Sequence, residues 1–526
     1  MNQPFNWQKL QNGSDIRGVA LEGVPGELVN LTPEVVRVIS QSFVIWLAQR
    51  QNQSPTALTI SVGRDSRLAG PALTQATLQG IAALGSRVYD FAMASTPAMF
   101  MSTITPGLNC DGAIMLTASH LPFNRNGLKF FTPQGGLQKQ DISEILAIAA
   151  DEQNNLRNTL QASAPQDKHG DIIAGDIIAY DFIAEYAGQL VQTIRQGVNH
   201  PQHYDQPLQG LKIIVDAGNG AGGFYAAQVL QPLGADTTGS QFLEPDGTFP
   251  NHVPNPEDEA AMQSICQAVI DHQADFGIIF DTDVDRSAAV DHTGKELNRN
   301  RLIALISAII LREHPGTTIV TDSITSEGLT QFIEQDLHGI HHRFKRGYKN
   351  VIDEALRLNE SGQESWLAIE TSGHAALKEN YFLDDGAYLV SKLLIELAKS
   401  KLAHQSLPDL IATLKEPTES VEYRLKIKTE DFKQYGDRVL EALQGFVRNQ
   451  PNWAIVPHTY EGLRVSCPDP SEGGWFLLRL SLHDPVMPLN IESNHQGGTA
   501  IISARLLEFF STMDGLELPQ ALQHSC

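Results

Sequence analysis

The sequence predicts an α/β protein that has three related mixed α/β domains and a smaller α+β domain at its C-terminal end. Its 526 residues exceed the size at which a single hydrophobic core stops growing, about 250–300 residues. Three segments share one layout, in which a short run rich in Val and Ile precedes a polar turn and a helix-like stretch. These segments begin at Leu58, Leu211 and Thr317. After Leu414 the pattern of polar and apolar residues changes to an alternating one.

The three repeated segments predict βαβ units. They read LTISVGRDSRLAGPALTQATLQGIAAL, LKIIVDAGNGAGGFYAAQVLQPLG and TTIVTDSITSEGLTQFIEQ. Apolar strands that alternate with amphipathic helices are typical of sheets covered by helices on both faces. Ligands of open α/β sheets bind at the polar turns that follow the strands. A site is therefore expected at these turns.

Turn-rich stretches that begin at Gly197, Arg312 and Leu414 predict the domain boundaries. The region after Leu414 contains VEYRLKIKTEDF and GGWFLLRLSL, which alternate between polar and apolar residues as half-buried strands do. This region is predicted to be the smaller α+β domain. The four predicted domains span residues 1–205, 206–313, 314–417 and 418–526.

The composition excludes several classes of function. Hydrophobic residues make up 42% of the chain and charged residues 19%, which is typical of a globular protein rather than a disordered one. The formal net charge of −23 argues against binding to nucleic acid or to an anionic membrane surface, because both attract an excess of Lys and Arg. Cations that bind a phosphorylated substrate must therefore be gathered locally.

The cysteines and the apolar runs indicate a cytoplasmic protein. The four cysteines lie far apart and form no CxxC pair, which argues against a disulfide framework or a zinc site; they are Cys110, Cys266, Cys467 and Cys526. The opening segment MNQPFNWQKLQNG has no apolar core that could serve as a signal peptide. The most apolar run, from Ile303 to Leu311, is too short to span a bilayer.

The most informative segment is TASHLPFNRNGLK, which begins at Thr117 and follows a predicted strand. A serine at a turn exposes its hydroxyl group, as Ser119 would here. His120 beside it and Lys129 ten residues later can supply acid–base function and positive charge. An isolated Ser-His pair is more often a capped turn beside a surface histidine, so the meaning of this pair depends on the whole segment.

A second segment, ADFGIIFDTDVDRSAAV, runs from a buried-type strand into three alternating carboxylates, Asp281, Asp283 and Asp285. Without a cation these like charges repel one another, and hard oxygen ligands suit Mg²⁺. A calcium EF-hand loop also begins D-x-D-x-D, but it needs Gly at its sixth position and Glu at its twelfth. This chain has Arg286 and His292 there. The alternative is three solvated surface aspartates, and the apolar strand that runs straight into them weakens it. The pattern favours a Mg²⁺ site.

Two further segments have the composition of binding loops. In AIETSGH, which ends at His374, acidic and hydroxyl side chains on a turn can exchange hydrogen bonds with sugar hydroxyls. Alone, this pattern is a weak signal, and the N-terminal cap of a helix is the better interpretation. The cluster RFKRGYK, from Arg343 to Lys349, is the densest basic cluster of this acidic chain. Charge runs are usually solvated helix faces, but Gly347 favours a loop.

Together these segments resemble the α-D-phosphohexomutase family, which includes phosphoglucomutases and phosphomannomutases. T-A-S-H-x-P followed by N-G and a lysine matches the active-site loop of the family, with Leu121 where Asn is usual. D-x-D-x-D-R matches its metal loop, and E-x-S-G-H, followed by D-D-G, matches its sugar loop in the form found in phosphomannomutase/phosphoglucomutase enzymes. SDIRG, GRDSR and NHVPNP match further family segments, so the resemblance runs from about Ser14 to at least Asp385.

The resemblance implies four domains around a central active-site cleft, and it assigns roles to individual residues. The catalytic group would be Ser119, His120, Lys129, Arg286 and His374. The metal ligands would be Asp281, Asp283, Asp285 and an oxygen of phosphorylated Ser119. The substrate-binding residues would be Arg17, Lys349, Glu370, Ser372, Arg479 and Ser481, with Arg346 as an additional candidate.

The last predicted domain departs from the family pattern. Where the family has a phosphate-binding loop of the type R-x-S-G-T-E-P, this chain has RLSLHDP, from Arg479 to Pro485. Leu482 and His483 replace the small and hydroxyl residues, and no further arginine follows before Glu492. A phosphate cradle needs several hydrogen-bond donors, so the non-reacting phosphate would be held more weakly or differently here.

The resemblance implies reversible conversion between hexose 1-phosphate and hexose 6-phosphate, with glucose or mannose or both as the sugar. The reaction would pass through phospho-Ser119 and a hexose 1,6-bisphosphate, with Mg²⁺ as cofactor and catalytic hexose 1,6-bisphosphate as activator. One alternative is a synthase that releases hexose 1,6-bisphosphate made from a sugar-bisphosphate donor, and another is a non-catalytic sugar-phosphate sensor. The expected partners are hexose phosphates, and the expected assembly is a monomer or a homodimer.

Overall fold

The computed structural model describes residues 5–163, 175–481 and 484–523. The chain forms two compact units. The first unit comprises Met1–Asn298, Ser372–Ala375 and Leu383–Leu407, and the second comprises Arg299–Thr371, Ala376–Phe382 and Pro408–Cys526.

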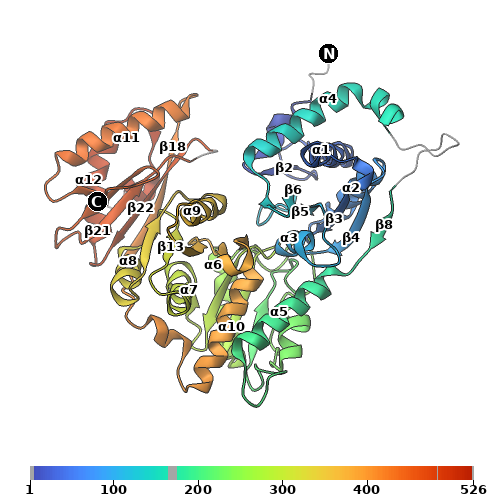
Figure 1. The fold of residues 1–526 in the computed structure, drawn as a ribbon. Helices are drawn as coiled ribbons and strands as arrows, with labels where there is room; N and C mark the ends of the chain where they lie inside the picture. The colour runs from blue at the N-terminus through green and yellow to red at the C-terminus, as the bar shows by residue number, and fades with distance from the viewer. Residues whose placement is uncertain (1–4, 164–174, 482–483, 524–526) are drawn as a thin grey trace. The chain divides into compact units, whose positions relative to one another are not determined.

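The first unit contains a mixed sheet in the order β1-β2-β6-β5-β3-β4-β8, and β7 pairs with β6 (Figure 1). Strands β5, β3, β4 and β8 run parallel. Strand β6 runs antiparallel to β5, and β2 runs antiparallel to β6. The strands are Gln11–Asn12 (β1), Asp15–Val19 (β2), Thr59–Arg64 (β3), Arg87–Met93 (β4), Gly112–Leu116 (β5), Arg125–Thr132 (β6), Gly135–Gly136 (β7) and Ile177–Ala179 (β8).

Helices α1 and α3 cover opposite faces of this sheet. A Cβ atom added to Gly112 of β5 would meet Phe43 of α1, whereas one added to Gly63 of β3 would meet Met99 of α3. Gly63 pairs with Met115, which lies an odd number of residues from Gly112, so the two glycines face opposite sides. The helices are Pro33–Gln51 (α1), Gly70–Ala82 (α2), Thr96–Ile104 (α3) and Lys139–Ser163 (α4).

The first unit also contains a sheet in the order β12-β11-β10-β9. Strands β9 and β10 are parallel, and β11 returns antiparallel beside β10. Strand β10 is buried along its whole length, and α6 packs in the same core through Met262 and Ile265. The elements are Ile213–Asp216 (β9), Phe276–Phe280 (β10), Ser287–Asp291 (β11), Glu296–Leu297 (β12), Phe182–Val198 (α5), Glu259–His272 (α6) and Gly386–Leu402 (α10).

The second unit begins with three parallel strands in the order β14-β13-β15. Val320 of β13 and Ala368 of β15 pack with Val351, Ala355 and Leu358 of α9. The elements are Arg299–Glu313 (α7), Thr318–Thr321 (β13), Glu327–Gln331 (α8), Ile340–Arg343 (β14), Tyr348–Glu360 (α9) and Ser365–Ile369 (β15). Strand β16 (Ala375–Leu377) follows in the chain, and the next strand, β17 (Leu383–Asp384), belongs to the first unit.

The rest of the second unit is an antiparallel sheet in the order β19-β20-β21-β22-β18-β23, with α11 and α12 packed into its core (Figure 1). Strand β18 alternates between exposed and buried residues in its second half, as its polar–apolar pattern predicts. The elements are Glu419–Ile427 (β18), Phe432–Arg448 (α11), Ala454–Ile455 (β19), Leu463–Cys467 (β20), Gly474–Leu478 (β21), Val486–Ser493 (β22), Gly498–Phe510 (α12), Leu516–Glu517 (β23) and Gln520–Gln523 (α13).

These sheets confirm the predicted fold class of mixed α/β domains followed by an α+β region. The strand–turn–helix layout is regular at β3 and α2. After β9 and β13 the helical segments are partly π-helical, at Tyr225–Leu230 and Phe332–Asp336. The four predicted domains stay a prediction, because the structure divides into two compact units whose limits do not follow the predicted boundaries.

Three cysteines of the described chain, Cys110, Cys266 and Cys467, are free thiols, and Cys526 lies outside the described residues. In the part of the chain that the structure describes, no helix combines the length and the apolarity needed to cross a bilayer.

A buried carboxyl group makes the stability of the second unit depend on pH. Glu492 of β22 accepts a hydrogen bond from Trp475 Nε1 at 2.9 Å and is 7% exposed. Burial raises the pKa of Glu492 to about 7, although Arg464 and the bond from Trp475 oppose the rise. In the unfolded chain the same group would titrate near 4.5.

We expect the second unit to lose stability as pH rises through about 7. The folded state binds the Glu492 proton more tightly than the unfolded state does, so this stabilisation is complete below pH 4.5. At about 1.4 kcal/mol per pKa unit, the loss is about 3 kcal/mol. The measurement is urea unfolding of the wild type and of Glu492→Gln at pH 5 and pH 8. Glutamine keeps the acceptor for Trp475 but does not titrate. The free energy of unfolding of the variant, relative to that of the wild type, should therefore be higher at pH 8 than at pH 5. The prediction is contradicted if the unfolding free energies of the two proteins differ by the same amount at pH 5 and at pH 8.

Candidate active site

The predicted nucleophile stands at a sharp turn after β5. Ser119 has a positive φ of 51°, is 5% exposed, and its N–H donates to Thr117 Oγ1 at 2.9 Å. Strand β6 passes close beside this turn, because Thr117 N donates to Gly127 O at 3.1 Å. A Cβ atom at Gly127 would lie 2.3 Å from Ile16 O and 2.9 Å from Thr117 O. Position 127 therefore needs glycine.

One buried guanidinium group holds the nucleophile loop. Arg67, which is 0% exposed, donates to Pro122 O at 2.9 Å, to Arg125 O at 3.1 Å and to Leu121 O at 2.6 Å. It also donates to Ser119 O. The charge of Arg67 is balanced by Asp65, 3.4 Å from its Nε. The sequence showed GRDSR as a motif, but the role of Arg67 needed the structure.

We expect Arg67→Lys to lower turnover by about 10²-fold, because misplaced reacting groups lose rate without losing binding. A lysine ammonium cannot reproduce a planar fork of donors that serves four carbonyl groups. The carbonyls left without partners should lower stability by about 2 kcal/mol. Steady-state kinetics and thermal unfolding measure both effects. The matched control is Arg64→Lys at the end of β3. Equal activity of the two variants would contradict the prediction.

The predicted metal ligands come together at the end of β10. The carboxylate oxygens of Asp281, Asp283 and Asp285 lie within 4.8 Å of one another, and all three residues are buried. Val284 has a positive φ of 68°, which turns the chain sharply inside this loop. Helix α3 supports the loop, because Thr96 N donates to Asp283 O at 2.8 Å and Thr96 Oγ1 donates to its carboxylate.

Two cations neutralise part of this charge. Lys129 Nζ lies 2.9 Å from Asp283 Oδ2 and also pairs with Asp285. Arg286 Nη2 lies 3.0 Å from Asp281 Oδ2. Burial raises the pKa of Asp281, and the carboxylates of Asp285 and Asp283 raise it further. Burial also opposes ionisation of Asp285, but Lys129, His374 and Arg286 outweigh it and lower the pKa of that carboxyl.

The donor set fits a hard divalent cation. Among the described residues, Asp283 Oδ1 and Asp285 Oδ1 have no hydrogen-bond partner although both atoms are buried. Buried carboxylate oxygens without partners are costly. Oxygen atoms of this kind are the ligands that Mg²⁺ prefers.

Arg286 joins the metal loop to the nucleophile. Its Nη2 donates to Ser119 Oγ at 2.7 Å, and Ser119 Oγ donates to Asp281 Oδ2 at 3.1 Å. Arg286 Nη2 also lies 2.7 Å from His120 Nδ1, and its Nη1 donates to Asn255 at 2.9 Å. Burial, Arg286 and Arg17 lower the pKa of His120 to about 3, so His120 is neutral near pH 7. Asn255 belongs to the NHVPNP motif, but its contact with Arg286 was not predicted.

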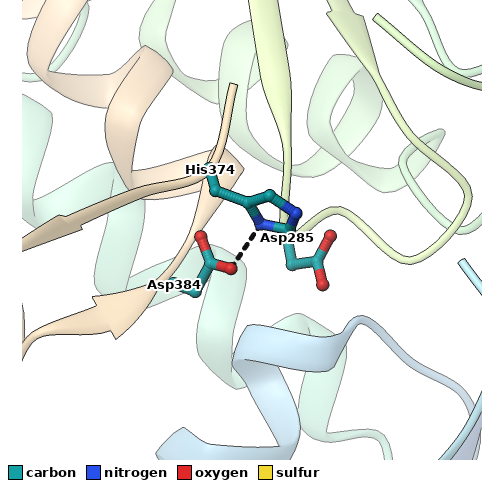
Figure 2. A group of neighbouring side chains, drawn as sticks. All are labelled: Asp285, His374 and Asp384. Carbon is teal, nitrogen blue, oxygen red and sulfur yellow. Dashed lines mark hydrogen bonds and ion pairs between the residues drawn. The ribbon is translucent and has the colours of Figure 1, made fainter. Parts of the chain in front are cut away.

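His374 lies in the same unit, beside Asp285. Figure 2 shows His374, Asp384 and Asp285 grouped together, and their potential ligand atoms lie within 4.8 Å of one another. His374 Nδ1 is 2.5 Å from Asp384 Oδ2. Burial lowers the pKa of His374, but Asp384 and Asp285 outweigh burial and raise it to about 9. The pairing of His374 with Asp384 was not predicted from the sequence.

Of the predicted substrate-binding residues, Arg17 and Ser372 also belong to the first unit. Arg17 lies on β2 opposite Gly127 of β6, and its Nη2 donates to Asp15 at 2.9 Å. The Ser372 hydroxyl is buried and has no hydrogen-bond partner within the described ranges.

A second group of predicted residues lies in the second unit, around the loop between β14 and α9. Glu370 accepts a hydrogen bond from Gly347 N at 2.6 Å, and Arg346 N donates to Glu461 at 2.9 Å. Arg346 Nε lies 3.8 Å from Asp322, which is fully buried. Glu461 and Asp322 were not predicted, because no motif surrounds Glu461 and Asp322 stood only in a generic strand-end turn.

The prediction of a loop for the basic cluster is correct for Phe344 to Gly347 and wrong for Lys349. Lys349 lies in the first turn of α9 and pairs with Asp353, one helical turn onward, at 3.1 Å. Gly347, with a φ of 116°, starts this helix. The i,i+4 spacing of Lys349 and Asp353 is the signal that favoured a helix.

The atypical loop after β21 is only partly described. Arg479 N donates to Pro488 O at 3.1 Å, and Ser481 Oγ accepts from Asp484 N at 3.3 Å. In the described part of the chain, Arg479 Nε is buried without a hydrogen-bond partner. The predicted departures at Leu482 and His483 lie outside the described residues.

Comparisons with known proteins agree with this arrangement of loops. Three family models match, described as phosphoglucomutase/phosphomannomutase α/β/α domains I, II and III, over residues 8–156, 186–294 and 298–416. A phosphomannomutase/phosphoglucomutase of Pseudomonas putida is 30% identical over 438 residues, which are 83% of each chain. A protein of Xanthomonas campestris named "Phosphohexose mutases" is 30% identical over 503 residues, 95% of this chain and 98% of its own.

A solved structure gives the same result. A phosphoglucomutase/phosphomannomutase family protein of Burkholderia thailandensis superposes with a TM-score of 0.75 at 26% identity, covering 97% of this chain and 99% of its own. Family models, relatives and this structure together cover the loops that hold Ser119, the three aspartates and His374. The chain belongs to the phosphoglucomutase/phosphomannomutase family.

Proposed function

We propose that this enzyme interconverts hexose 1-phosphates and hexose 6-phosphates by phosphoryl transfer through Ser119. One observation carries the proposal. Ser119 Oγ lies 2.7 Å from Arg286 Nη2 and 3.1 Å from Asp281 Oδ2, beside two further buried carboxylates. A hydroxyl group held between a fixed cation and a metal-type ligand set suits a phosphoryl acceptor and donor.

In the proposed reaction the hydroxyl oxygen of a bound sugar phosphate forms a bond to the phosphorus on Ser119. The bond between that phosphorus and Ser119 Oγ breaks, and the hydroxyl proton passes to a base. The resulting 1,6-bisphosphate turns round and returns its other phosphoryl group to Ser119. His374, Lys129 and His120 are the candidates for the proton transfers, which are worth about 10²–10⁴-fold in rate.

Asp281, Asp283 and Asp285 would hold Mg²⁺, with a phosphate oxygen on Ser119 as a further ligand. When bound, the ion neutralises charge on the transferring phosphoryl group. Arg286 would contact the same group, since it already donates to Ser119 Oγ. Lys129 bridges Asp283 and Asp285 and would share in charge neutralisation.

The remaining predicted residues would bind the sugar phosphate. Glu370 and Ser372 would read hydroxyl groups, whereas Arg17, Lys349, Arg479 and Ser481 would contact phosphate groups. Arg346 would be an additional phosphate ligand, from the same loop between β14 and α9. The buried Nε of Arg479, which lacks a partner among the described residues, supports a role for that residue.

The finer expectations belong to the same proposal. They are Mg²⁺ as the metal, a hexose 1,6-bisphosphate as activator, a cytoplasmic location, a monomer or homodimer, and no binding to nucleic acid. The net charge of −23 supports the last of these.

The two alternative functions are less well supported. The relatives carry the names of mutases, which does not favour a synthase that releases the bisphosphate. The complete set of Ser119, three aspartates and Arg286 in contact argues against a sensor without catalysis.

The test is ³¹P NMR of the purified protein with Mg²⁺ and glucose 1-phosphate, with and without a trace of glucose 1,6-bisphosphate. Catalytic formation of glucose 6-phosphate is the expected result, and mannose 1-phosphate then measures the preference for the sugar. Accumulation of bisphosphate from a sugar-bisphosphate donor, without exchange of the monophosphates, would overturn the mutase in favour of the synthase.

A further inference from the structure

The pair formed by His374 and Asp384 connects the sugar loop to β17. Asp384 is 7% exposed, and its two oxygens have separate partners. Oδ2 faces His374 Nδ1 at 2.5 Å, and Oδ1 accepts from Ala375 N at 3.1 Å. The carboxylate therefore cannot rotate away from the imidazole without leaving a buried N–H group unpaired.

The backbone of His374 is fixed as well. It forms an isolated antiparallel bridge with Arg286, the residue that contacts Ser119. The preceding Gly373 has a φ of 92° and its carbonyl accepts from Ser287 N at 3.5 Å. With its backbone held there and its Nδ1 held by Asp384, the ring has one orientation (Figure 2).

We propose that Asp384 is a positioning residue, which holds one proton of His374 on Nδ1 in both charge states of the ring and so leaves Nε2 as the atom that exchanges protons during phosphoryl transfer. An ionised carboxylate only accepts hydrogen bonds, so the ring nitrogen that faces it must carry the proton. The nitrogen opposite is then fixed as the working atom. This inference rests on the proposed function, because it assigns His374 to proton transfer.

The neighbouring carboxylate, that of Asp385, has different hydrogen-bond partners. Asp385 accepts from Tyr186 Oη at 2.7 Å with both oxygens, and its Oδ1 accepts from Tyr388 N at 2.8 Å at the start of α10. Asp384 and Asp385 are thus adjacent, buried and of the same residue type, but Asp384 contacts the imidazole whereas Asp385 contacts Tyr186 and the start of a helix. The chain itself provides a matched control.

The substitution Asp384→Asn keeps the shape of the side chain but removes its negative charge and changes the tautomer that it favours in His374. An asparagine has one acceptor oxygen where Asp384 uses two. If that oxygen keeps the bond from Ala375 N, the amide NH₂ group faces Nδ1 and favours the other tautomer of the ring. Replacing the carboxylate partner of a catalytic histidine by an amide has this effect in serine proteases.

The experiment is a double-mutant cycle with Asp384→Asn and His374→Gln, and Asp385→Asn as control. We expect each member of the cycle to lower kcat by about 10²-fold or more with KM nearly unchanged. The double variant should be no slower than His374→Gln alone, because Asp384 acts through the imidazole. Asp385→Asn should keep a kcat close to that of the wild type. Additive losses in the cycle, or an unaffected kcat in Asp384→Asn, would overturn the proposal.

A second measurement does not depend on turnover. A short hydrogen bond between Nδ1–H and a carboxylate should give a far-downfield ¹H NMR resonance in the wild type. It should vanish in His374→Gln and in Asp384→Asn, and persist in Asp385→Asn. If Asp384→Asn does not fold, absence of this resonance from the wild type still overturns the pairing. A wild type that shows the resonance but no mutase turnover would instead count against the proposed function.

Discussion

Ser119→Ala should have no measurable mutase turnover, a loss of at least about 10⁴-fold, as is found when a catalytic nucleophile is removed. In the proposed mechanism the hydroxyl group accepts and donates the phosphoryl group, and in the structure it lies between Arg286 and Asp281. The measurements are glucose 6-phosphate formation and the intact mass of the protein after incubation with glucose 1,6-bisphosphate. The wild type should gain one phosphoryl group, and the variant should gain none.

Two companion variants separate chemistry from folding. Ser119→Gly also lacks the hydroxyl, but glycine accepts the positive φ of 51° at this position. We expect it to be equally inactive and more stable than Ser119→Ala by about 1 kcal/mol. Ser61→Ala removes a buried hydroxyl of the same sheet, one that bonds to Ser102, and should leave turnover near the wild-type rate. Full activity in Ser119→Ala would end the phosphoserine mechanism.

Removal of divalent metal should abolish turnover, and Mg²⁺ should restore it. The same ion should stabilise the protein, by about 2.7 kcal/mol at a free concentration 100 times its Kd. The reason is that Asp281, Asp283 and Asp285 are buried together, and a bound cation relieves their repulsion. The measurements are activity after chelation and thermal unfolding with and without Mg²⁺.

The control for the metal site is a second buried aspartate at the end of a neighbouring strand. Asp216 ends β9, beside β10, and its carboxylate accepts from Gly218 N and Gln241 and contacts His252. Asp283→Asn should lose most of the stabilisation by Mg²⁺, whereas Asp216→Asn should keep it even if the fold is weakened. The idea of a metal site at these aspartates fails if both variants respond to Mg²⁺ as the wild type does.

The sequence was most informative where function depends on consecutive residues. Ser119 and the three aspartates stand directly after strands whose apolar runs are easy to identify, so the ends of β5 and β10 and the polar residues after them were predicted together. The alternation in β18 likewise predicted a half-buried strand.

Contacts between distant residues could not be predicted in this way. Arg67 binds carbonyl groups some 50 residues later in the chain, and the backbone N–H of Arg346 donates to Glu461. A single sequence has no signal for such pairs. The prediction of a loop at Lys349 was wrong for another reason. The charge of Lys349 was considered apart from Asp353, with which it forms an ion pair along the helix.

The hold of Arg67 on the nucleophile loop has a consequence for the whole catalytic cycle. In the proposed mechanism Ser119 gives up a phosphoryl group and takes one back in each turnover, and the two transfers involve opposite ends of the sugar. A loop that depended on its substrate for order would incur the conformational entropy of ordering at both transfers. Here one buried cation already holds the carbonyl groups of Ser119, Leu121 and Pro122 in the folded chain. The entropy is lost once, when the protein folds, and both transfers start from the same geometry.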